Sequence, residues 1–223
     1  MVQLEIACFS AASAVIAQQS GAHRIELCAD RAVGGITPSL DVFTQVKTQA
    51  DLPIYVMIRP RGGDFVYAAA EFEQMKQQLL RFKLAGANGF VFGCLQENGK
   101  VHDIQNKELV QLAHPFPCTF HRAFDEIQNK EQGLLSIADC GFKTILTAGH
   151  SGNASDGIPV LKKLQAQAKD KILLMPGGGI RSTVAAQICR KTQVTWLHSS
   201  AITSGKEADP KEIKAILAAV QKA

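Results

Sequence analysis

The sequence predicts an α/β protein, a single (β/α)8 TIM-type barrel, and three observations lead to this prediction. Short apolar runs alternate with longer amphipathic segments along the whole chain, which is typical of parallel βαβ units. Eight such units fit into 223 residues, and one barrel domain commonly takes roughly 200–250 residues. No linker or shift in composition divides the sequence, so we expect one domain over residues 1–223. An open doubly wound sheet is the structural alternative.

The predicted strands are short and mostly apolar, and each is followed by a predicted helix. In chain order the strands are Gln3–Cys8, His23–Cys28, Ile54–Arg59, Gly89–Gly93, Cys118–Arg122, Phe142–Thr147, Lys171–Met175 and Val194–His198. The helices are Ser10–Ser20, Pro38–Ala50, Glu71–Ala85, Asn106–Ala113, Asp125–Cys140, Asp156–Ala168, Arg181–Arg190 and Pro210–Lys222. Gly21, Gly86 and Gly141 each follow a helical pattern, where a left-handed cap favours glycine, and this supports the segmentation.

Composition and charge narrow the class of protein. Hydrophobic residues make up 46% of the chain and charged residues 20%, which favours a large core and argues against disorder. The net charge of +4 is spread along the sequence without a block of Lys or Arg, so we expect no nucleic-acid partner. No apolar run approaches the roughly 20 residues of a membrane span, so we expect no membrane association either.

The cysteines and the N-terminal residues bear on the cellular location. The six cysteines stand far apart and form no CxxC pair. A disulfide scaffold is typical of small secreted domains, so free thiols in a reducing cytosol are the simpler interpretation. The first residues enter a strand-like run directly, and we expect no secretory signal. A cytoplasmic location is therefore the expectation.

Strand alternation places charged side chains inside the barrel. In the second strand, Ile25 and Leu27 belong to the helix side, whereas Glu26 and Cys28 point inward. Buried charges are costly unless they are paired, so the inward set is either an ion-pair network or a functional cluster. Most of these residues lie in the later half of their strands, toward the C-terminal mouth where barrel enzymes have their sites, and we favour the functional cluster. The inward polar set is Glu5, Glu26, Arg59, His121 and His198.

Arginine-rich loops after two predicted strands favour an anion site. Arg59 and Arg61 flank a proline after the third strand, and Arg122 ends the fifth. Guanidinium groups held in this way can fork onto a carboxylate or a phosphate. The alternative is a lattice of arginines and aspartates that only closes the barrel top, with Asp64 and Asp125 as partners.

The loops after the last two predicted strands favour a phosphate site. Gly177, Gly178 and Gly179 follow the seventh strand, and Ser199 and Ser200 follow the eighth. Barrel phosphate sites are often built from these two loops, with amides of a helix N-terminus as donors. A tight strand-to-helix turn is the alternative, because glycines permit that as well. The sequence has no P-loop and no GxGxxG after the first strand, so no nucleotide cofactor is expected.

Six segments together resemble the CutC copper-homeostasis family. They follow one another in order along almost the whole chain: Ile25–Cys28, Gly34–Ser39, Val56–Phe65, Thr119–Asp125, Pro176–Ile180 and His198–Ala201. The resemblance implies a TIM-type barrel, a cytoplasmic location and a link to copper handling, without an agreed reaction.

The resemblance also bears on copper ligands, which in this family are proposed to be two cysteines near the ends of the first two strands. It carries the second of them onto Cys28. The first falls on Ala7, and the nearest cysteine is Cys8. One residue along a strand turns a side chain to the other face, so Cys8 is expected to face the helices. Cys28 with Met57, a soft pair on inward faces, is the remaining Cu(I) candidate.

Three functions fit these patterns. The chemistry of the residues alone favours an enzyme, whereas the resemblance favours a copper-handling protein, which we take as the expected function with the enzyme as the alternative. A copper-binding or copper-delivery role rests on the resemblance and on Cys28. An enzyme for a small anionic, phosphorylated substrate would use Glu26 or His121 as general acid or base. A structural module explains the fold but not the inward charges. The expected ligand is a small anion or Cu(I), and a homo-oligomer stays open. The candidate catalytic residues are Glu26, Arg59, Arg61, His121, Arg122 and Asp125, the phosphate-binding residues are Gly177, Gly178, Gly179, Ser199 and Ser200, and the metal ligand is Cys28.

Overall fold

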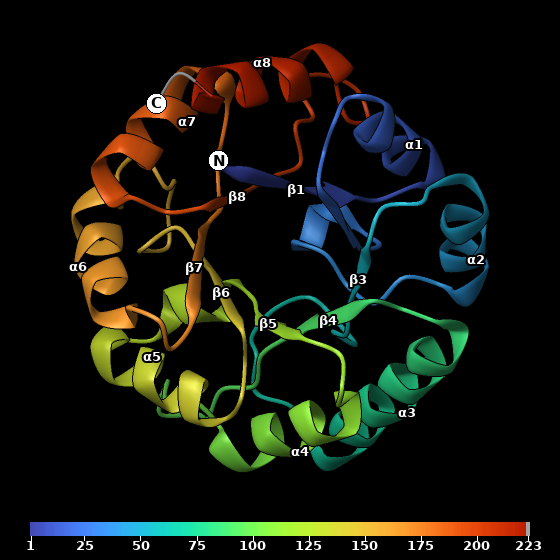
Figure 1. Cartoon of the computed structure of the whole chain (residues 1–223). Coiled ribbons are helices and arrows are strands. Elements are labelled where there is room, and N and C mark those ends of the chain that lie inside the picture. The colour runs from blue at the N-terminus through green and yellow to red at the C-terminus, as the bar shows by residue number, and fades with distance from the viewer. Residues whose placement is uncertain (222–223) are drawn as a thin grey trace.

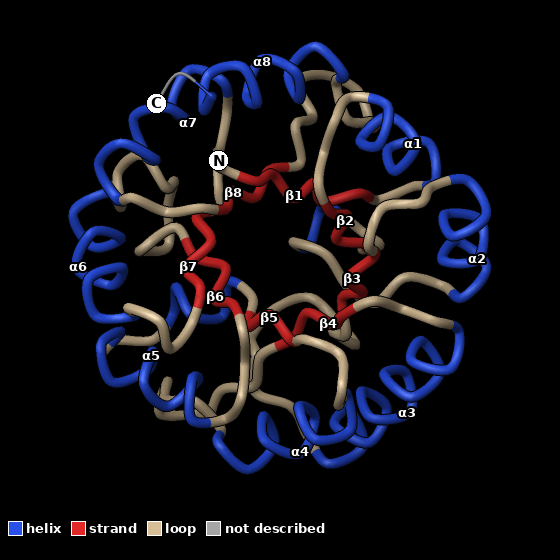
Figure 2. The backbone as a smooth tube through the Cα atoms, in the orientation of Figure 1, coloured by secondary structure: helices blue, strands red, loops and turns tan. Residues whose placement is uncertain are grey.

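The computed structural model, which describes residues 1–221, is a ring of parallel strands enclosed by helices (Figure 1). The sheet order is β7-β6-β5-β4-β3-β2-β1-β8, and every ladder within it is parallel. Its two end strands, β7 and β8, come together, so the sheet forms a nearly closed barrel as the sequence predicts (Figure 2). The strands are β1 Gln3–Cys8, β2 Arg24–Leu27, β3 Ile54–Met57, β4 Gly89–Phe92, β5 Cys118–Phe120, β6 Thr144–Thr147, β7 Leu173–Pro176 and β8 Trp196–Ser199.

The outer layer consists of helices that alternate with the strands. Side-chain caps define where some of them begin, as at Ser10 and Ser39, whose hydroxyls accept from the amides of Ser13 and Val42. The predicted end of the last helix at Lys222 lies outside the described residues. The helices are α1 Ala11–Gln19, α2 Leu40–Gln49, α3 Ala69–Ala85, α4 Asp103–Ala113, α5 Lys130–Asp139, α6 Ile158–Ala168, α7 Ser182–Thr192 and α8 Pro210–Gln221, with 3-10 turns η1 Arg31–Val33 and η2 Arg122–Glu126.

The predicted helix from Asp125 to Cys140 is wrong at its start. Asp125 lies in η2, and α5 begins only after Asn129, whose side chain caps it by accepting from the amide of Gln132 at 3.0 Å. The carboxylate of Asp125 is held instead against the end of β6, where it accepts from the amide of Ala148 at 3.1 Å. Most other predicted boundaries differ from the observed ones by a few residues at the ends.

Alternation along the strands divides the side chains between two faces, as predicted. The larger cluster lies between the strands and the helices and contains Cys8 together with Ile25 and Leu27. A small separate cluster inside the barrel contains Cys28 and Met57. Cys8 and Cys28 therefore face opposite sides of the sheet, which confirms the predicted register of the first two strands.

Arg24 fills the barrel interior below the mouth and neutralises one of the inward carboxylates. Its guanidinium carbon lies 4.1 Å from the ring centroid of Tyr55 and 4.2 Å from that of Trp196. Its Nε lies 2.5 Å from Oε2 of Glu5, which is fully buried. The buried guanidinium thus has two aromatic faces and one carboxylate as partners, and it fixes Glu5 at the base of the region described next.

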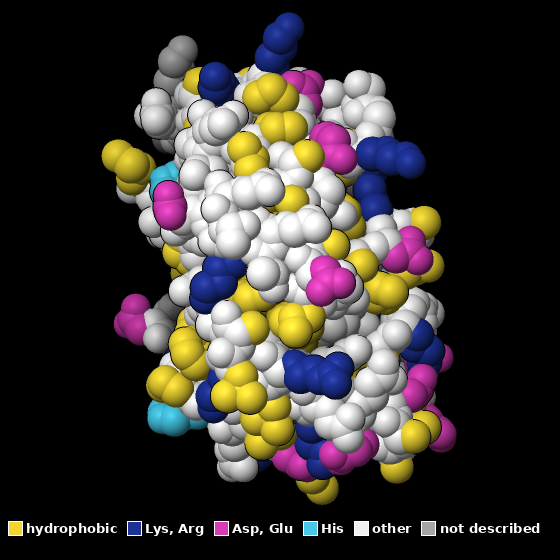
Figure 3. All heavy atoms as spheres, turned by 90° about the vertical axis from the view of Figure 1, so that its right-hand side faces the viewer, with side chains coloured by type: hydrophobic (Ala, Val, Ile, Leu, Met, Phe, Trp, Pro, Cys, Tyr) yellow, Lys and Arg dark blue, Asp and Glu magenta, His cyan; other side chains and the backbone are white. Residues whose placement is uncertain are grey.

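The outer surface in view carries charges of both signs. Figure 3 shows one side of the molecule, where Lys and Arg are interspersed with Asp and Glu and do not gather into one basic stripe. No helix within residues 1–221 has the length and apolarity needed to cross a bilayer.

Candidate functional site

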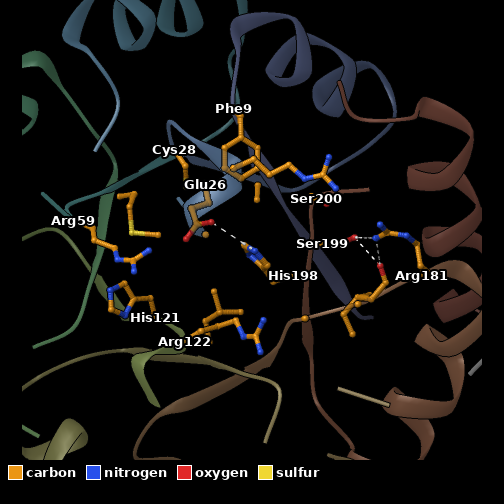
Figure 4. A pocket seen from close by; sticks show the side chains of 18 of the residues that line it. Phe9, Glu26, Cys28, Arg59, His121, Arg122, Arg181, His198, Ser199 and Ser200 are labelled. Atoms are coloured by element: carbon orange, nitrogen blue, oxygen red, sulfur yellow. Dashed lines mark hydrogen bonds and ion pairs between the residues drawn. The ribbon is translucent and has the colours of Figure 1, made fainter. Parts of the chain in front are cut away.

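A cavity of about 330 Å³ opens where the strands end, and we refer to it as the mouth cavity (Figure 4). Four arginines line it, so its walls carry more positive than negative charge and favour an anionic ligand. Its polar lining residues are Glu26, Cys28, Arg31, Arg59, His121, Arg122, Arg181, His198, Ser199 and Ser200, with Gly34, Gly178 and Gly179 from the loops.

The mouth cavity brings together most of the predicted site residues. Three of them do not reach it: Arg61, Asp125 and Gly177. The sequence reasoning missed Arg181 as a site residue, although it stands directly after the glycine-rich loop at the start of α7. That position is itself the signal by which it could have been found. The predicted site residues on the cavity wall are Glu26, Cys28, Arg59, His121, Arg122, Gly178, Gly179, Ser199 and Ser200.

Arg61 closes the loop between β3 and α3 and does not face the cavity. Its Nε lies 2.6 Å from Oε1 of Glu71, and its Nη2 lies 3.1 Å from Oδ1 of Asp64. Nη2 also donates to the carbonyl of Val66 at 2.8 Å. For Arg61 the structure therefore agrees with the alternative of an arginine and aspartate lattice, because Asp64 of the same loop and Glu71 of α3 pair with its guanidinium.

Asp125 positions Arg122, which does face the cavity. Its Oδ2 lies 2.7 Å from Nε of Arg122, while its other oxygen accepts from the hydroxyl of Thr147. The Arg122 guanidinium lies over the glycine-rich loop, since a Cβ atom on Gly178 would be 3.1 Å from Arg122 Cζ. Asp125 therefore acts through the arginine that it holds.

The glycine-rich loop turns two of its three amides away from the sheet. The amide of Gly177 donates to the carbonyl of Thr147 at 3.0 Å and so continues the β6–β7 ladder. Gly178 and Gly179 have φ angles of +97° and +70°, which favour glycine. Within residues 1–221, neither of these amides donates a hydrogen bond to a protein acceptor. These two amides are therefore available to a ligand, whereas Gly177 is not.

The two serines of the last loop differ in what they contact. The hydroxyl of Ser199 donates to the carbonyl of Ile180 at 2.8 Å and accepts from the amide of Ala201 at 3.0 Å. Arg181 reaches the same hydroxyl at 3.3 Å (Figure 4). Ser199 thus connects the β7 and β8 loops, while Ser200 lines the cavity and accepts from the amide of Ile202 at 3.5 Å.

Glu26, His198 and Glu5 form a chain of buried groups at the bottom of the mouth cavity. Nδ1 of His198 lies 2.7 Å from Oε1 of Glu5, and Nε2 lies 3.6 Å from Oε2 of Glu26. Among the described residues, Oε1 of Glu26 has no hydrogen-bond partner. Because this carboxyl is only 3% exposed, such an atom indicates a group that a ligand completes.

The charges in this chain shift the pKa of each member. Burial raises the pKa of Glu26, an effect that the positive charge of His198 only partly offsets. Burial also acts on His198 and lowers its pKa, but the carboxylates of Glu26 and Glu5 outweigh burial and raise it overall. Glu5 is desolvated too, yet Arg24 and His198 hold its pKa below the usual value. Glu26 is therefore the carboxyl that can change protonation state, and Glu5 is the fixed anion.

His121 and Arg59 leave two buried N–H groups without partners. Nδ1 of His121 accepts from the amide of Ala123 at 3.3 Å, so the neutral ring carries its proton on Nε2, which has no partner within the described residues. Burial and the charge of Arg59 lower the pKa of His121 to about 3. Arg59 donates to the carbonyls of Val33 and Gly63, while its Nε stays unpartnered among residues 1–221.

The side chains of Cys28 and Met57 both line the mouth cavity and lie against the same glycine. A Cβ atom on Gly35 would lie 3.4 Å from Sγ of Cys28 and 3.7 Å from Cε of Met57, so both side chains close over the same glycine. Burial, with the neighbouring charge of Glu26, raises the pKa of the Cys28 thiol well above its usual value. Ala7 also lines the cavity, whereas Cys8 does not.

Comparison with known proteins links this geometry to one family. The model of the CutC family matches residues 2–203. A mouse protein named copper homeostasis protein cutC homolog is 43% identical over 201 residues, which cover 90% of this chain and 74% of the mouse protein. The human protein of the same name is 42% identical, over 89% of this chain and 72% of its own length. The crystal structure of the putative copper homeostasis protein CutC from Streptococcus agalactiae is 30% identical, with a TM-score of 0.86 over 91% of this chain and 100% of that chain.

Proposed function

The chain belongs to the CutC family, and we propose that it takes part in copper homeostasis by binding Cu(I) through Cys28 and Met57. The observation that supports this proposal is the convergence of the two sulfur side chains over Gly35 on the cavity wall. A thiolate and a thioether are soft ligands, which is the class that Cu(I) prefers. All six cysteines are free, in keeping with the reducing cytoplasm in which we propose that the protein acts.

Anaerobic titration of Cu(I) against a competing chelator tests this proposal. Cys28→Ser is expected to lower the Cu(I) affinity at least about tenfold, since even indirect partners of a metal contribute about 10–100-fold. Cys8→Ser is the matched control. The Cu(I) affinity of this variant should stay close to that of wild type, because Cys8 lies in the core between the strands and the helices. An equal loss in both variants, or no loss in Cys28→Ser, would contradict the proposal.

A second function, an enzyme for a small phosphorylated substrate, is supported by a different observation. Buried donors without partners meet in one positively charged cavity, namely Nε of Arg59 and Nε2 of His121, together with the amides of Gly178 and Gly179. Such donors favour an anion. In this proposal Glu26 is the general acid or base, because its pKa is raised and one of its oxygens is unpartnered. Arg122 and the two glycine amides hold the phosphate.

Thermal unfolding in phosphate tests the anion site. Phosphate is expected to raise Tm by about 3 °C for each tenfold rise in its concentration above Kd, with sodium chloride at matched ionic strength as the reference. Arg122→Ala should reduce this gain. Arg61→Ala should keep it, because Arg61 pairs with Glu71 outside the cavity. If phosphate stabilises no better than chloride, or if both variants lose the gain equally, the second function loses its support.

A further inference from the structure

We propose that Glu26 and His198 bind a divalent cation of borderline softness, such as Zn²⁺, at the bottom of the mouth cavity. Oε2 of Glu26 and Nε2 of His198 lie 3.6 Å apart. Oxygen and nitrogen ligands about 2.0–2.2 Å from a tetrahedral zinc lie about 3.3–3.6 Å from each other. The two atoms therefore already stand at the separation that one shared ion requires.

Glu5 completes this arrangement by orienting the histidine. Its Oε1 lies 2.7 Å from Nδ1 of His198, so the proton of the neutral imidazole sits on Nδ1 and the lone pair of Nε2 faces Glu26. In metal sites, a carboxylate commonly accepts a hydrogen bond from the ring nitrogen of histidine that does not bind the metal, and this fixes the orientation and the tautomer of the ring. Ligand atoms of Glu5, Glu26 and His198 all lie within 4.8 Å of one another.

Charge and the unpartnered oxygen of Glu26 also favour a cation at this point. When His198 is neutral, as a ligating imidazole must be, the buried carboxylates Glu5 and Glu26 have one guanidinium beside them, that of Arg24, which pairs with Glu5. Glu26 is left with an oxygen that has no partner among the described residues although it is buried. A cation would supply the missing partner for this carboxylate.

The inference goes beyond the proposed Cu(I) site, because the donor atoms and the class of ion differ. Carboxylate oxygen and imidazole nitrogen suit divalent Zn²⁺, whereas the Cys28 and Met57 sulfurs suit Cu(I). Both protein ligands line the mouth cavity, so the remaining coordination positions would open to water or to a bound anion (Figure 4). This is the arrangement of zinc sites that keep a position open for chemistry.

Isothermal titration with Zn²⁺ tests the site. Zn²⁺ is redox-inert and leaves the six thiols reduced, which makes it a better probe than Cu²⁺. We expect Glu26→Gln and His198→Asn each to lower the Zn²⁺ affinity at least about tenfold. Glu97→Gln and His114→Asn replace exposed residues of the same types and should retain wild-type affinity. Cys28→Ser should lower the Zn²⁺ affinity less than Glu26→Gln does, although it removes the thiol of the proposed Cu(I) site.

X-ray absorption at the zinc edge of the wild-type protein supplies a readout that does not depend on how the variants fold. The expected spectrum shows imidazole and oxygen ligands without a sulfur shell. A sulfur shell, a loss of Zn²⁺ binding in Cys28→Ser but not in Glu26→Gln, or no difference between site and control variants would each overturn the proposal. His198→Asn should keep Cu(I) binding while it loses Zn²⁺ affinity, so the failure of either metal site is visible separately.

Discussion

Replacement of Arg24 by alanine is expected to destabilise the fold by about 3–5 kcal/mol, because it leaves the carboxylate of Glu5 buried without its cation. Glu5 is fully buried, and Arg24 Nε lies 2.5 Å from it. The change also removes the guanidinium from between the rings of Tyr55 and Trp196, where it lies 4.1 Å and 4.2 Å from their centroids. The side chain of Arg24 is only 9% exposed, so bulk water has little access to the groups that the substitution leaves without a partner.

Urea unfolding monitored by circular dichroism measures this effect. Lys76→Ala is the matched control, since Lys76 pairs with Glu73 and Glu108 on the surface, where water screens the ions. Its unfolding midpoint should stay near that of wild type. The prediction is contradicted if the unfolding midpoint of Arg24→Ala lies as close to that of wild type as the midpoint of Lys76→Ala does. The barrel interior would then admit water, and the ion pair of Arg24 and Glu5 would not stabilise the barrel.

The sequence was sufficient to predict the barrel and the direction of most strand residues, because strand alternation is a local property. The two-residue period places Cys8 and Cys28 on opposite faces wherever the strands begin or end, and the structure bears this out. The same period identified Glu5, Glu26 and His198 as inward residues. The contacts among these three residues could not be predicted from local sequence patterns. Glu5 and His198 are separated by 193 residues and come together only when β1 pairs with β8.

The directions of loop side chains were predicted less well than those of strand side chains, because no periodic pattern in the sequence shows which way a loop side chain points. Arg59 and Arg61 stand two residues apart and looked equivalent in sequence. Only Arg59 lines the mouth cavity, while Arg61 turns to Glu71, a residue whose proximity depends on how α3 packs. Arg181 shows the reverse case, since it was assigned to a helix and yet lines the cavity. A long side chain contacts whichever partners the tertiary structure brings close to it, and the local sequence motif does not show which partners those are.

His121 is expected to make the fold less stable as the pH falls from about 6.5 to about 3. Burial and the charge of Arg59 lower its pKa to about 3, from the usual value of 6.5. In the unfolded chain the imidazole takes up a proton near pH 6.5, whereas in the folded protein it stays neutral until about pH 3. The unfolded state therefore binds one more proton across this window, and the free energy of unfolding falls as the pH is lowered. The full loss is on the order of 5 kcal/mol, at about 1.4 kcal/mol for each unit of pKa shift.

Only the difference between wild type and a His121 variant isolates this contribution, because the raised pKa values of Glu26 and His198 act in the opposite sense. In His121→Asn, the side-chain oxygen can replace Nδ1 as the acceptor for the amide of Ala123, while the titrating ring is gone. Urea unfolding at a series of pH values should give a shallower loss of stability toward low pH in this variant than in wild type. His114→Asn, at an exposed position, should follow the wild-type curve. Parallel curves for wild type and His121→Asn would show that the ring takes up its proton at the same pH in the folded and the unfolded protein. Below about pH 6.5 His121 would then present a charged group to the mouth cavity instead of the neutral Nε2–H donor on which the anion site depends.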